Sequence, residues 1–298
     1  MAMDDIRYTF EYMKKTFRAF LLSVVLAAVS FGSAAVERGD VRYTQKDMDK
    51  FDEVMALTAA DREAPMADLV VKIAKHFIGT PYVAGTLEIE PERLTVNMAG
   101  TDCILFVEMC VALALTAKDD EPTFDKYLDN LAALRYRDGI VDGYTSRLHY
   151  TSEWIAQGER RGVFKEVTRE CGGSPLAQKF NFMSTHPASY KQLKDSPADV
   201  AKMRRIEQSL EAHDYCYIPK ADLPRCIKDI RSGDIIAFCS TVAGLDIAHI
   251  GIALWDGDDL TFIHASTSEK KVIINPKPLT AYISGVKSQS GLRVIRLH

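Results

Sequence analysis

The chain has 298 residues, of which 47% are hydrophobic and 26% are charged, which is ordinary globular composition with room for one large domain or two small ones. The formal net charge is −4, and no basic cluster is interleaved with aromatic residues, which argues against a nucleic-acid partner. The sequence has neither a C-x-x-C nor an H-x-x-x-H pattern, so we expect no metal site and no other cofactor.

The N-terminus has the three parts of a secretory signal peptide. Residues 13–18 are basic, residues 19–29 are apolar, and residues 33–35 supply small side chains for cleavage. The apolar run is too short and wrongly flanked for a transmembrane span. We therefore expect residues 1–35 to be a signal peptide and the protein to be exported, periplasmic or secreted, without stable membrane insertion after cleavage. A start at Met13 gives a cleaner signal than Met1, so residues 1–12 are a candidate over-called start.

Helices are predicted in the part of the chain that follows the signal. One is expected over residues 46–57, and a second begins after Pro65, where apolar residues recur at helical spacing until Gly79 ends the run. Residues 36–78 are thus predicted to form an N-terminal helical segment. A long, mostly polar stretch is predicted to be a helical insertion at residues 116–225, with helices over 125–134 and 197–212.

The last part of the chain changes character. Apolar runs separated by Gly, Asp and Pro turns predict strands over residues 234–239, 248–255, 260–265, 272–274 and 292–297. Helices first and strands afterwards indicate an α+β fold with an antiparallel sheet in the C-terminal part. We expect residues 36–298 to form a single domain.

Cys103 stands at the predicted start of a helix that is apolar on nearly every face. Asp102 or Thr101 can cap this helix, because both side chains accept hydrogen bonds from free N–H groups. The helix dipole and those N–H groups favour the thiolate, which is the reactive form. A helix that is apolar all round is a buried one, so the pattern indicates a nucleophile at the tip of a central helix. The alternative is a structural cysteine, because free cysteine is among the most buried residue types.

The remaining cysteines leave the disulfide pattern open. Six cysteines in an exported chain invite disulfides. Cys103, Cys110 and Cys239 lie in apolar segments, whereas the others lie in polar or loop-like sequence. Of these, Cys216 and Cys226 are a candidate bridge.

Two histidines flank a predicted hairpin. His249 begins one strand, His264 ends the next, and the turn at residues 256–259 lies between them. If Trp255 pairs with Leu260, the two histidines are diagonal neighbours on one face, within reach of a ring-to-ring contact. A slip of one residue in the pairing would place the two histidines on opposite faces, so the prediction depends on this exact register.

A thiol, an imidazole that takes its proton and a polar group that fixes the tautomer of that imidazole together make a nucleophilic triad. Cys103, His249 and His264 supply these groups, and such partners meet in space whatever their spacing in sequence. Gly251 and Ala253 share the predicted face of the histidines and are small. We expect them to leave room there for the helix that begins at Cys103.

A polar and aromatic loop at residues 146–154 enters a short predicted helix. Its density of Arg, His, Tyr and Trp suits contact with a ligand, although an ordinary surface loop is the alternative. The candidate contact residues are Arg147, His149, Tyr150 and Trp154.

Five ordered motifs give the chain a family resemblance. They are P-Y-x-x-G at residues 81–85, D-C at 102–103, G-D and two apolar residues at 233–236, H-I-G-I at 249–252, and His264. With these motifs the chain resembles the NlpC-type, papain-like cysteine peptidases and amidases. It is most similar to their N-acetylmuramoyl-L-alanine amidase-like branch, formerly a domain of unknown function. The resemblance implies a papain-like core in which Cys103 attacks an amide, His249 acts as base, His264 orients His249, and Tyr82 lies near the oxyanion.

That branch cleaves the bond between N-acetylmuramic acid and L-alanine in peptidoglycan fragments, and anhydro-muropeptides are the implied substrates. The insertion at residues 116–225 would then wall the cleft, and residues 36–298 would be one catalytic domain. The branch usually has D-C-T-T-F-V-E where this chain has Ile104 and Leu105 in place of the two threonines. A γ-D-glutamyl–diaminopimelate endopeptidase with the same triad and a non-catalytic protein that binds cell-wall fragments are the alternatives.

Overall fold

A computed structural model describes residues 40–298, all of which belong to one compact unit of the chain. The expected signal peptide and the expected start at Met13 lie outside the described residues. No helix in the described part of the chain is long and apolar enough to cross a membrane.

The helices of the described part come mostly before the strands. The longer helices are α2 (Gln45–Thr58), α3 (Met66–His76), α4 (Cys103–Ala117), α5 (Phe124–Arg135), α6 (Thr151–Arg160) and α8 (Pro197–Leu210). The shorter helices are α7 (Phe182–Thr185), α9 (Leu223–Cys226) and α10 (Leu279–Gly285). The predicted helices at 46–57, 125–134 and 197–212 thus match α2, α5 and α8.

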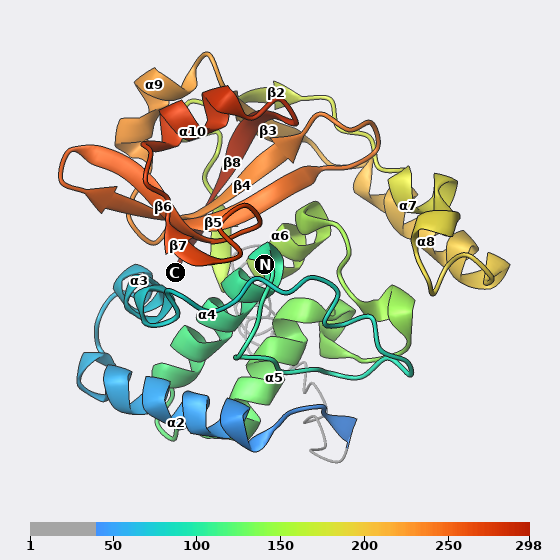
Figure 1. The fold of residues 1–298 in the computed structure, drawn as a ribbon. Coiled ribbons are helices and arrows are strands. Elements are labelled where there is room, and N and C mark those ends of the chain that lie inside the picture. The colour runs from blue at the N-terminus through green and yellow to red at the C-terminus, as the bar shows by residue number, and fades with distance from the viewer. Residues whose placement is uncertain (1–39) are drawn as a thin grey trace, which may run out of the picture. The chain divides into compact units, whose positions relative to one another are not determined.

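An antiparallel sheet runs through the C-terminal half (Figure 1). Its strands follow the order β2-β3-β8-β4-β5-β6-β7, and β1 also pairs with β8. The bounds are β1 (Phe164–Glu166), β2 (Ser174–Leu176), β3 (Tyr215–Pro219), β4 (Ile235–Ser240), β5 (Ile247–Asp256), β6 (Asp259–Ser266), β7 (Lys271–Ile274) and β8 (Gln289–Leu297). The α+β prediction is confirmed, and the five predicted strands match β4 to β8.

The insertion is not purely helical, contrary to the prediction. Between residues 116 and 225 it carries α5 to α8, but it also contributes β1, β2 and β3 to the sheet. These strands are three to five residues long, and β2 contains Pro175, which cannot donate to a ladder. Such short runs give too little alternation to be recognised in sequence.

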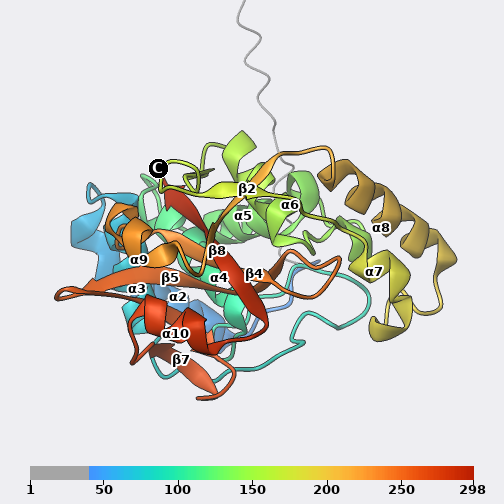
Figure 2. The ribbon, with the colours of Figure 1, turned by 90° about the horizontal axis from the view of Figure 1, so that it is seen from above.

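Both faces of the sheet are buried. On one face, α4 packs with β5 and β6, where the apolar side chains of Ile250, Ile252 and Ile263 lie in one core with helices α2 to α6. On the other face, Phe238, Ala253 and Phe262 pack in a second core with α10. In Figure 1, α4 and α10 accordingly lie on opposite sides of the strands. A third, smaller core lies within the insertion and packs α7 and α8 against Tyr144, Tyr150 and Tyr215, on the side away from α9 and α10 (Figure 2).

The G-D motif at residues 233–234 joins the helical layer to the sheet. Gly233 has φ +87°, and a Cβ there would lie 2.6 Å from Ala67 of α3, so glycine is required both for the turn and for the close approach. Asp234 is buried and accepts two hydrogen bonds from Arg296 of β8, of 2.9 and 2.7 Å. This motif therefore has a structural role at the start of β4.

Candidate active site

Cys103 is the first residue of α4, as its position in the sequence predicts. The Asp102 side chain caps the helix and accepts a hydrogen bond of 3.0 Å from the N–H of Leu105. Of the two predicted caps it is Asp102 that acts, while the Thr101 hydroxyl donates to a backbone carbonyl. The helix behind is buried along almost its whole length, whereas Cys103 itself is only partly buried. Cys103 is thus held on a rigid element and keeps part of its residue surface exposed.

The hairpin register places His249 and His264 side by side, as predicted. Trp255 pairs with Leu260, and the β5–β6 ladder runs to its last pair, Ile252 and Ile263. Just beyond that pair, Nε2 of His249 lies 2.7 Å from Nδ1 of His264. The rings meet edge to face with centroids 4.9 Å apart. Because Nε2 is the atom turned to His264, the Nδ1 atom of His249 is left for another partner.

The histidines lie on the face of the sheet opposite to the one that α4 covers, so the expected packing was wrong. Ala253 shares their face and belongs to the core that α10 completes. Cys103 instead lies near the histidines at the end of the β5–β6 ladder. Its sulfur accepts a hydrogen bond from the backbone N–H of Ile250, the residue next to His249. Alternation along a strand shows which residues share a face, but it does not show which element covers that face.

The expected thiolate is not favoured at rest. Burial raises the pKa of Cys103 to about 12, and the Asp102 carboxylate adds to this. The N–H groups at the helix tip act in the lowering direction, but burial is the larger effect. Burial also lowers the pKa of His249 to about 4. At neutral pH the thiol and the imidazole are therefore both uncharged.

His264 is buried, with 3% of its surface exposed. Burial lowers its pKa to about 3, the neighbouring His249 acts in the same direction, and Asn275 opposes them. Aromatic rings surround it: its centroid lies 4.4 Å from that of Phe262 and 6.1 Å from that of Tyr282 on α10. An uncharged imidazole is the form that such a setting favours.

Backbone hydrogen bonds hold Tyr82 beside the segment that leads to Cys103. Its N–H donates to the carbonyl of Lys270, and the neighbouring N–H of Thr101 donates to the carbonyl of Pro81. Burial raises the pKa of the Tyr82 phenol, and the next contribution comes from Cys103. Tyr82 is thus a protonated donor near the thiol.

Sequence reasoning missed two polar groups at this site. Burial raises the pKa of Tyr282, and Cys103 contributes to the shift, so this phenol also lies near the thiol. Asn275 follows β7 and is 7% exposed. Asn275 stands before Pro276 at the end of a predicted strand, where an ordinary turn is the simplest interpretation of the sequence.

A cavity of about 180 Å³ adjoins the tip of α4 and contains part of the predicted contact loop. Arg147 and His149 line it, together with Ile104 and Leu105, so the residues that replace the family threonines give it an apolar wall. Arg147 is 6% exposed and its Nε has no hydrogen-bond partner within residues 40–298.

Tyr150 and Trp154 do not line this cavity, and each is 1% exposed. The Tyr150 hydroxyl donates to Glu207 over 2.7 Å, and Trp154 stacks on Phe164 with centroids 4.5 Å apart. Trp154 belongs to the core that helices α2 to α6 share with the sheet, and Tyr150 belongs to the third core, so neither is placed for contact with a ligand. Burial lowers the pKa of His149 to about 3, and the nearby Arg147 acts in the same direction, so His149 is neutral.

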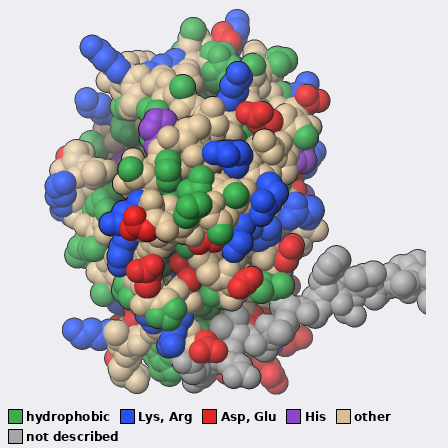
Figure 3. All heavy atoms as spheres, turned by 90° about the vertical axis from the view of Figure 1, so that its right-hand side faces the viewer, with side chains coloured by type: hydrophobic (Ala, Val, Ile, Leu, Met, Phe, Trp, Pro, Cys, Tyr) green, Lys and Arg blue, Asp and Glu red, His purple; other side chains and the backbone are tan. Residues whose placement is uncertain are grey.

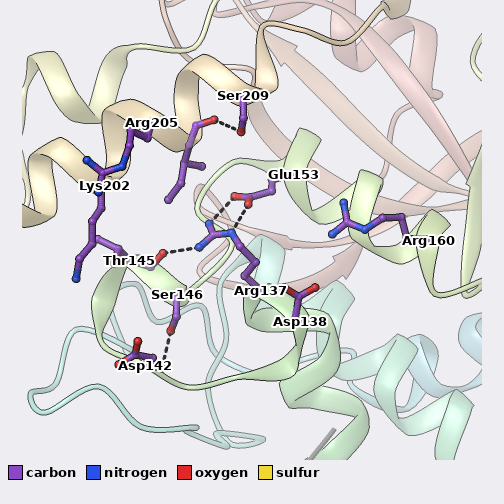
Figure 4. A pocket seen from close by; sticks show the side chains of 11 residues that line it. Arg137, Asp138, Asp142, Thr145, Ser146, Glu153, Arg160, Lys202, Arg205 and Ser209 are labelled. Atoms are coloured by element: carbon purple, nitrogen blue, oxygen red, sulfur yellow. Dashed lines mark hydrogen bonds and ion pairs between the residues drawn. The ribbon is translucent and has the colours of Figure 1, made fainter. Parts of the chain in front are cut away.

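A larger cavity, of about 550 Å³, lies between α8 and the segment from residue 137 to α6 (Figure 4). Arg137 spans it and binds Glu153 at 2.6 and 3.1 Å. Its rim mixes four cations with three carboxylates, and Figure 3 shows basic and acidic side chains interspersed on this side. None of the candidate catalytic residues lines this cavity.

No group of three potential metal-ligating side chains is found in the part of the chain that the structure describes. All six cysteines are free, so Cys216 and Cys226 are not bridged. Cys171, Cys216 and Cys226 are buried, although their surrounding sequence is polar.

The chain is similar to one described protein family and to several solved structures. Residues 72–291 match the AmiA-like family model, described as N-acetylmuramoyl-L-alanine amidase-like. A solved N-acetylmuramoyl-L-alanine amidase from Bacteroides uniformis is 40% identical, with 78% of this chain and 99% of that chain covered and a TM-score of 0.75. A Bacteroides fragilis protein provisionally named a xylanase is 41% identical, with 76% and 99% covered and a TM-score of 0.72. A Legionella pneumophila protein is 20% identical, with 84% and 95% covered and a TM-score of 0.64, and shares the fold. No functionally curated protein matches.

Proposed function

We propose, for a chain that belongs to the N-acetylmuramoyl-L-alanine amidase-like family, that it is a cysteine amidase acting on peptidoglycan fragments. The bond is the amide between N-acetylmuramic acid and L-alanine, and anhydro-muropeptides are the proposed substrates. One observation carries the proposal: the 2.7 Å contact between Nε2 of His249 and Nδ1 of His264, next to a thiol at a capped helix tip. We also propose that the core is of the NlpC type, that residues 36–298 form one catalytic domain, and that the protein is exported to the periplasm or secreted.

The reaction starts from an uncharged pair. As the Cys103 sulfur attacks the muramoyl carbonyl, Nδ1 of His249 takes the thiol proton, while its Nε2–H donates to His264. The N–H of Cys103 and the Tyr82 hydroxyl donate to the oxyanion. The C–N bond then breaks, and His249 returns its proton to the departing amine of L-alanine. Water, deprotonated by His249, hydrolyses the thioester and frees the sugar acid.

The charges of the 180 Å³ cavity support a neutral sugar as its occupant. Arg135 is bound to Glu108 at 2.7 Å, and Arg147 lies 3.1 Å from Glu88. The lining also contains Asp102, so its carboxylates outnumber its cations. A carboxylate of the stem peptide would therefore be repelled from this cavity. Hydroxyl and acetamido groups carry no charge and can hydrogen-bond to the polar side chains of the lining.

Glycoside hydrolysis, which the name of the Bacteroides fragilis protein suggests, needs two free carboxyl groups facing one bond. Here Asp102 caps α4 and Glu108 is buried against Arg135. The third carboxylate that lines the cavity, Glu88, pairs with Arg147, so all three are already engaged, and the site favours amide cleavage.

A defined disaccharide anhydro-muropeptide with a tetrapeptide stem tests the proposal. Mass spectrometry should find the free disaccharide acid and an intact peptide that begins with L-alanine. A disaccharide that keeps L-Ala–D-Glu, with release of the diaminopimelate-containing remainder of the stem, would instead identify the endopeptidase, and binding without turnover would identify the binding protein.

The Cys103→Ala variant should lose turnover and keep its circular dichroism spectrum. Cys216→Ala, a cysteine on β3, is the matched control and should retain activity. Activity should survive a chelator and be lost with a thiol alkylator. Turnover by Cys103→Ala would refute the nucleophile.

A further inference from the structure

Polar side chains at the site lie on β5, on β6 and at the end of β7, whereas the two histidines of the proposed triad occupy only β5 and β6. His249 of β5 and His264 of β6 are diagonal neighbours on one face of the sheet. His264 pairs with Ile273 of β7, and the N–H of Asn275 donates to the carbonyl of Phe262 over 2.8 Å. Asn275 is therefore the diagonal neighbour of His264 on that same face, just as His264 is of His249.

The contact between the two rings can hold its proton in two ways. If His249 donates through Nε2–H, its Nδ1 carries a lone pair and can act as a base. If His264 donates through Nδ1–H, the proton of His249 lies on Nδ1 and the ring cannot accept the thiol proton. Both rings are neutral at neutral pH, so the tautomer of His264 decides which arrangement exists.

The competent arrangement puts a proton on Nε2 of His264. That atom is buried and has no hydrogen-bond partner of good geometry among the described residues. A buried N–H without an acceptor is costly. The other arrangement, in which His264 donates through Nδ1–H and Nε2 carries no proton, would avoid this cost. The competent state therefore needs an acceptor next to Nε2.

Asn275 has the fixed amide that this role requires. Its Nδ2 donates to the carbonyl of Lys277 over 2.7 Å, and the Thr261 hydroxyl donates to its backbone carbonyl over 2.7 Å. The amide is thus oriented, and its Oδ1 is left as the acceptor. We propose that Asn275 is a positioning residue that accepts the Nε2–H of His264 and thereby holds His249 in its base-competent tautomer.

Two further facts bear on this role. The Asn275 side chain acts to raise the pKa of His264, as an acceptor beside the ring does. The other titratable groups near His264 are His249 and Tyr282, and neither supplies an acceptor to Nε2 in the described residues.

The test uses ¹⁵N-histidine NMR together with kinetics on the anhydro-muropeptide. In the unmodified protein, both His249 and His264 should be Nε2–H tautomers. In Asn275→Ala, His264 should lose that tautomer and kcat should fall about tenfold to a hundredfold with KM little changed, as for removal of an outer hydrogen-bond partner. Asn275→Asp keeps an acceptor, so it should restore the tautomer and most of kcat and move the acidic limb of the pH profile upward.

Thr168→Val is the matched control, because it removes the hydrogen bonds of a buried hydroxyl elsewhere in the sheet without touching Asn275 or His264. It should lower the melting temperature but keep the tautomer and kcat. Equal losses in Thr168→Val and Asn275→Ala would show a merely structural role, and an unchanged tautomer in Asn275→Ala would overturn the inference.

The inference rests on the proposed function, but the two fail separately. The tautomer and the rate at which iodoacetamide alkylates Cys103 need no substrate. A protein that cleaves no muropeptide and still shows the tautomer change and slower alkylation in Asn275→Ala would refute the proposed substrate and support the role of Asn275.

Discussion

Replacing Gly251 by alanine should disable the site with a single methyl group. Gly251 lies on β5 between His249 and the end of the β5–β6 ladder. A Cβ there would meet the carbonyl oxygen of Ile263 and a ring carbon of Phe262 at 2.9 Å, and the Cβ of His264 at 3.2 Å. Ordinary contacts lie at about 3.5–4.0 Å, so β5 and β6 must separate by roughly half an ångström or more.

Two effects of different size should follow from Gly251→Ala. Overpacking of a filled core costs about 1–3 kcal/mol, so the free energy of unfolding should fall by that amount. The contact between the histidines is 2.7 Å long and lies on the separating strands. A misplacement of about 1 Å can cost about a hundredfold in rate, so we expect kcat to fall about tenfold to a hundredfold.

Urea denaturation and muropeptide kinetics measure both effects. Gly285→Ala, at the end of α10, is the matched control, because a Cβ there meets nothing within 4 Å. It should leave the stability within about 0.5 kcal/mol and the activity unchanged. Full activity and unchanged stability in Gly251→Ala would refute the account of how the hairpin holds the two rings together.

Three further predictions follow from the buried charges and from the neutral triad. Arg135→Met would leave the buried Glu108 carboxylate without its partner and should lower the free energy of unfolding by about 3–5 kcal/mol. Lys165→Met, in an exposed pair, should leave the free energy of unfolding almost unchanged, and equal losses in the two variants would contradict this. Because folding lowers three histidine pKa values to about 3 or 4, the unfolded chain binds more protons just below pH 6.5. The melting temperature should therefore fall as the pH drops from 6.5 toward 4, and a flat profile would count against the burial of His149, His249 and His264. With the pKa of Cys103 at about 12, alkylation by iodoacetamide should quicken steadily above neutral pH, and a plateau already reached in acid would indicate a resting thiolate–imidazolium pair.

The part of the site that follows from local rules could be predicted from the sequence. A tight turn fixes the register of a hairpin, so the meeting of His249 and His264 followed from the turn at residues 256–259. Asp102 before an apolar run similarly fixed the start of α4 and the place of Cys103. Both predictions needed only neighbours in sequence.

The rest depended on burial by distant parts of the chain. Both faces of the sheet are covered, so the small residues beside the histidines could not reveal that α10 covers their face and α4 the other. The pKa of Cys103 is raised, not lowered as expected, because the effect of burial is larger than that of the N–H groups at the helix tip. Trp154 looked like a ligand contact in a polar stretch, but Phe164, ten residues on, stacks on it in the core.

A histidine as the third group of the proposed triad suits the aromatic setting of the site. Phe238 and Phe262 pack on the same face, and a carboxylate buried there would carry a charge with little solvent to stabilise it. A neutral His264 avoids that cost and can still accept a hydrogen bond. In the proposed mechanism, however, it cannot offset the positive charge that develops on His249 as the thiol proton moves. That stabilisation must come from the negative charge forming at the substrate, which the tip of α4 and Tyr82 hold close by. In such a site, the charged pair forms only when a substrate carbonyl is in place to receive the electrons.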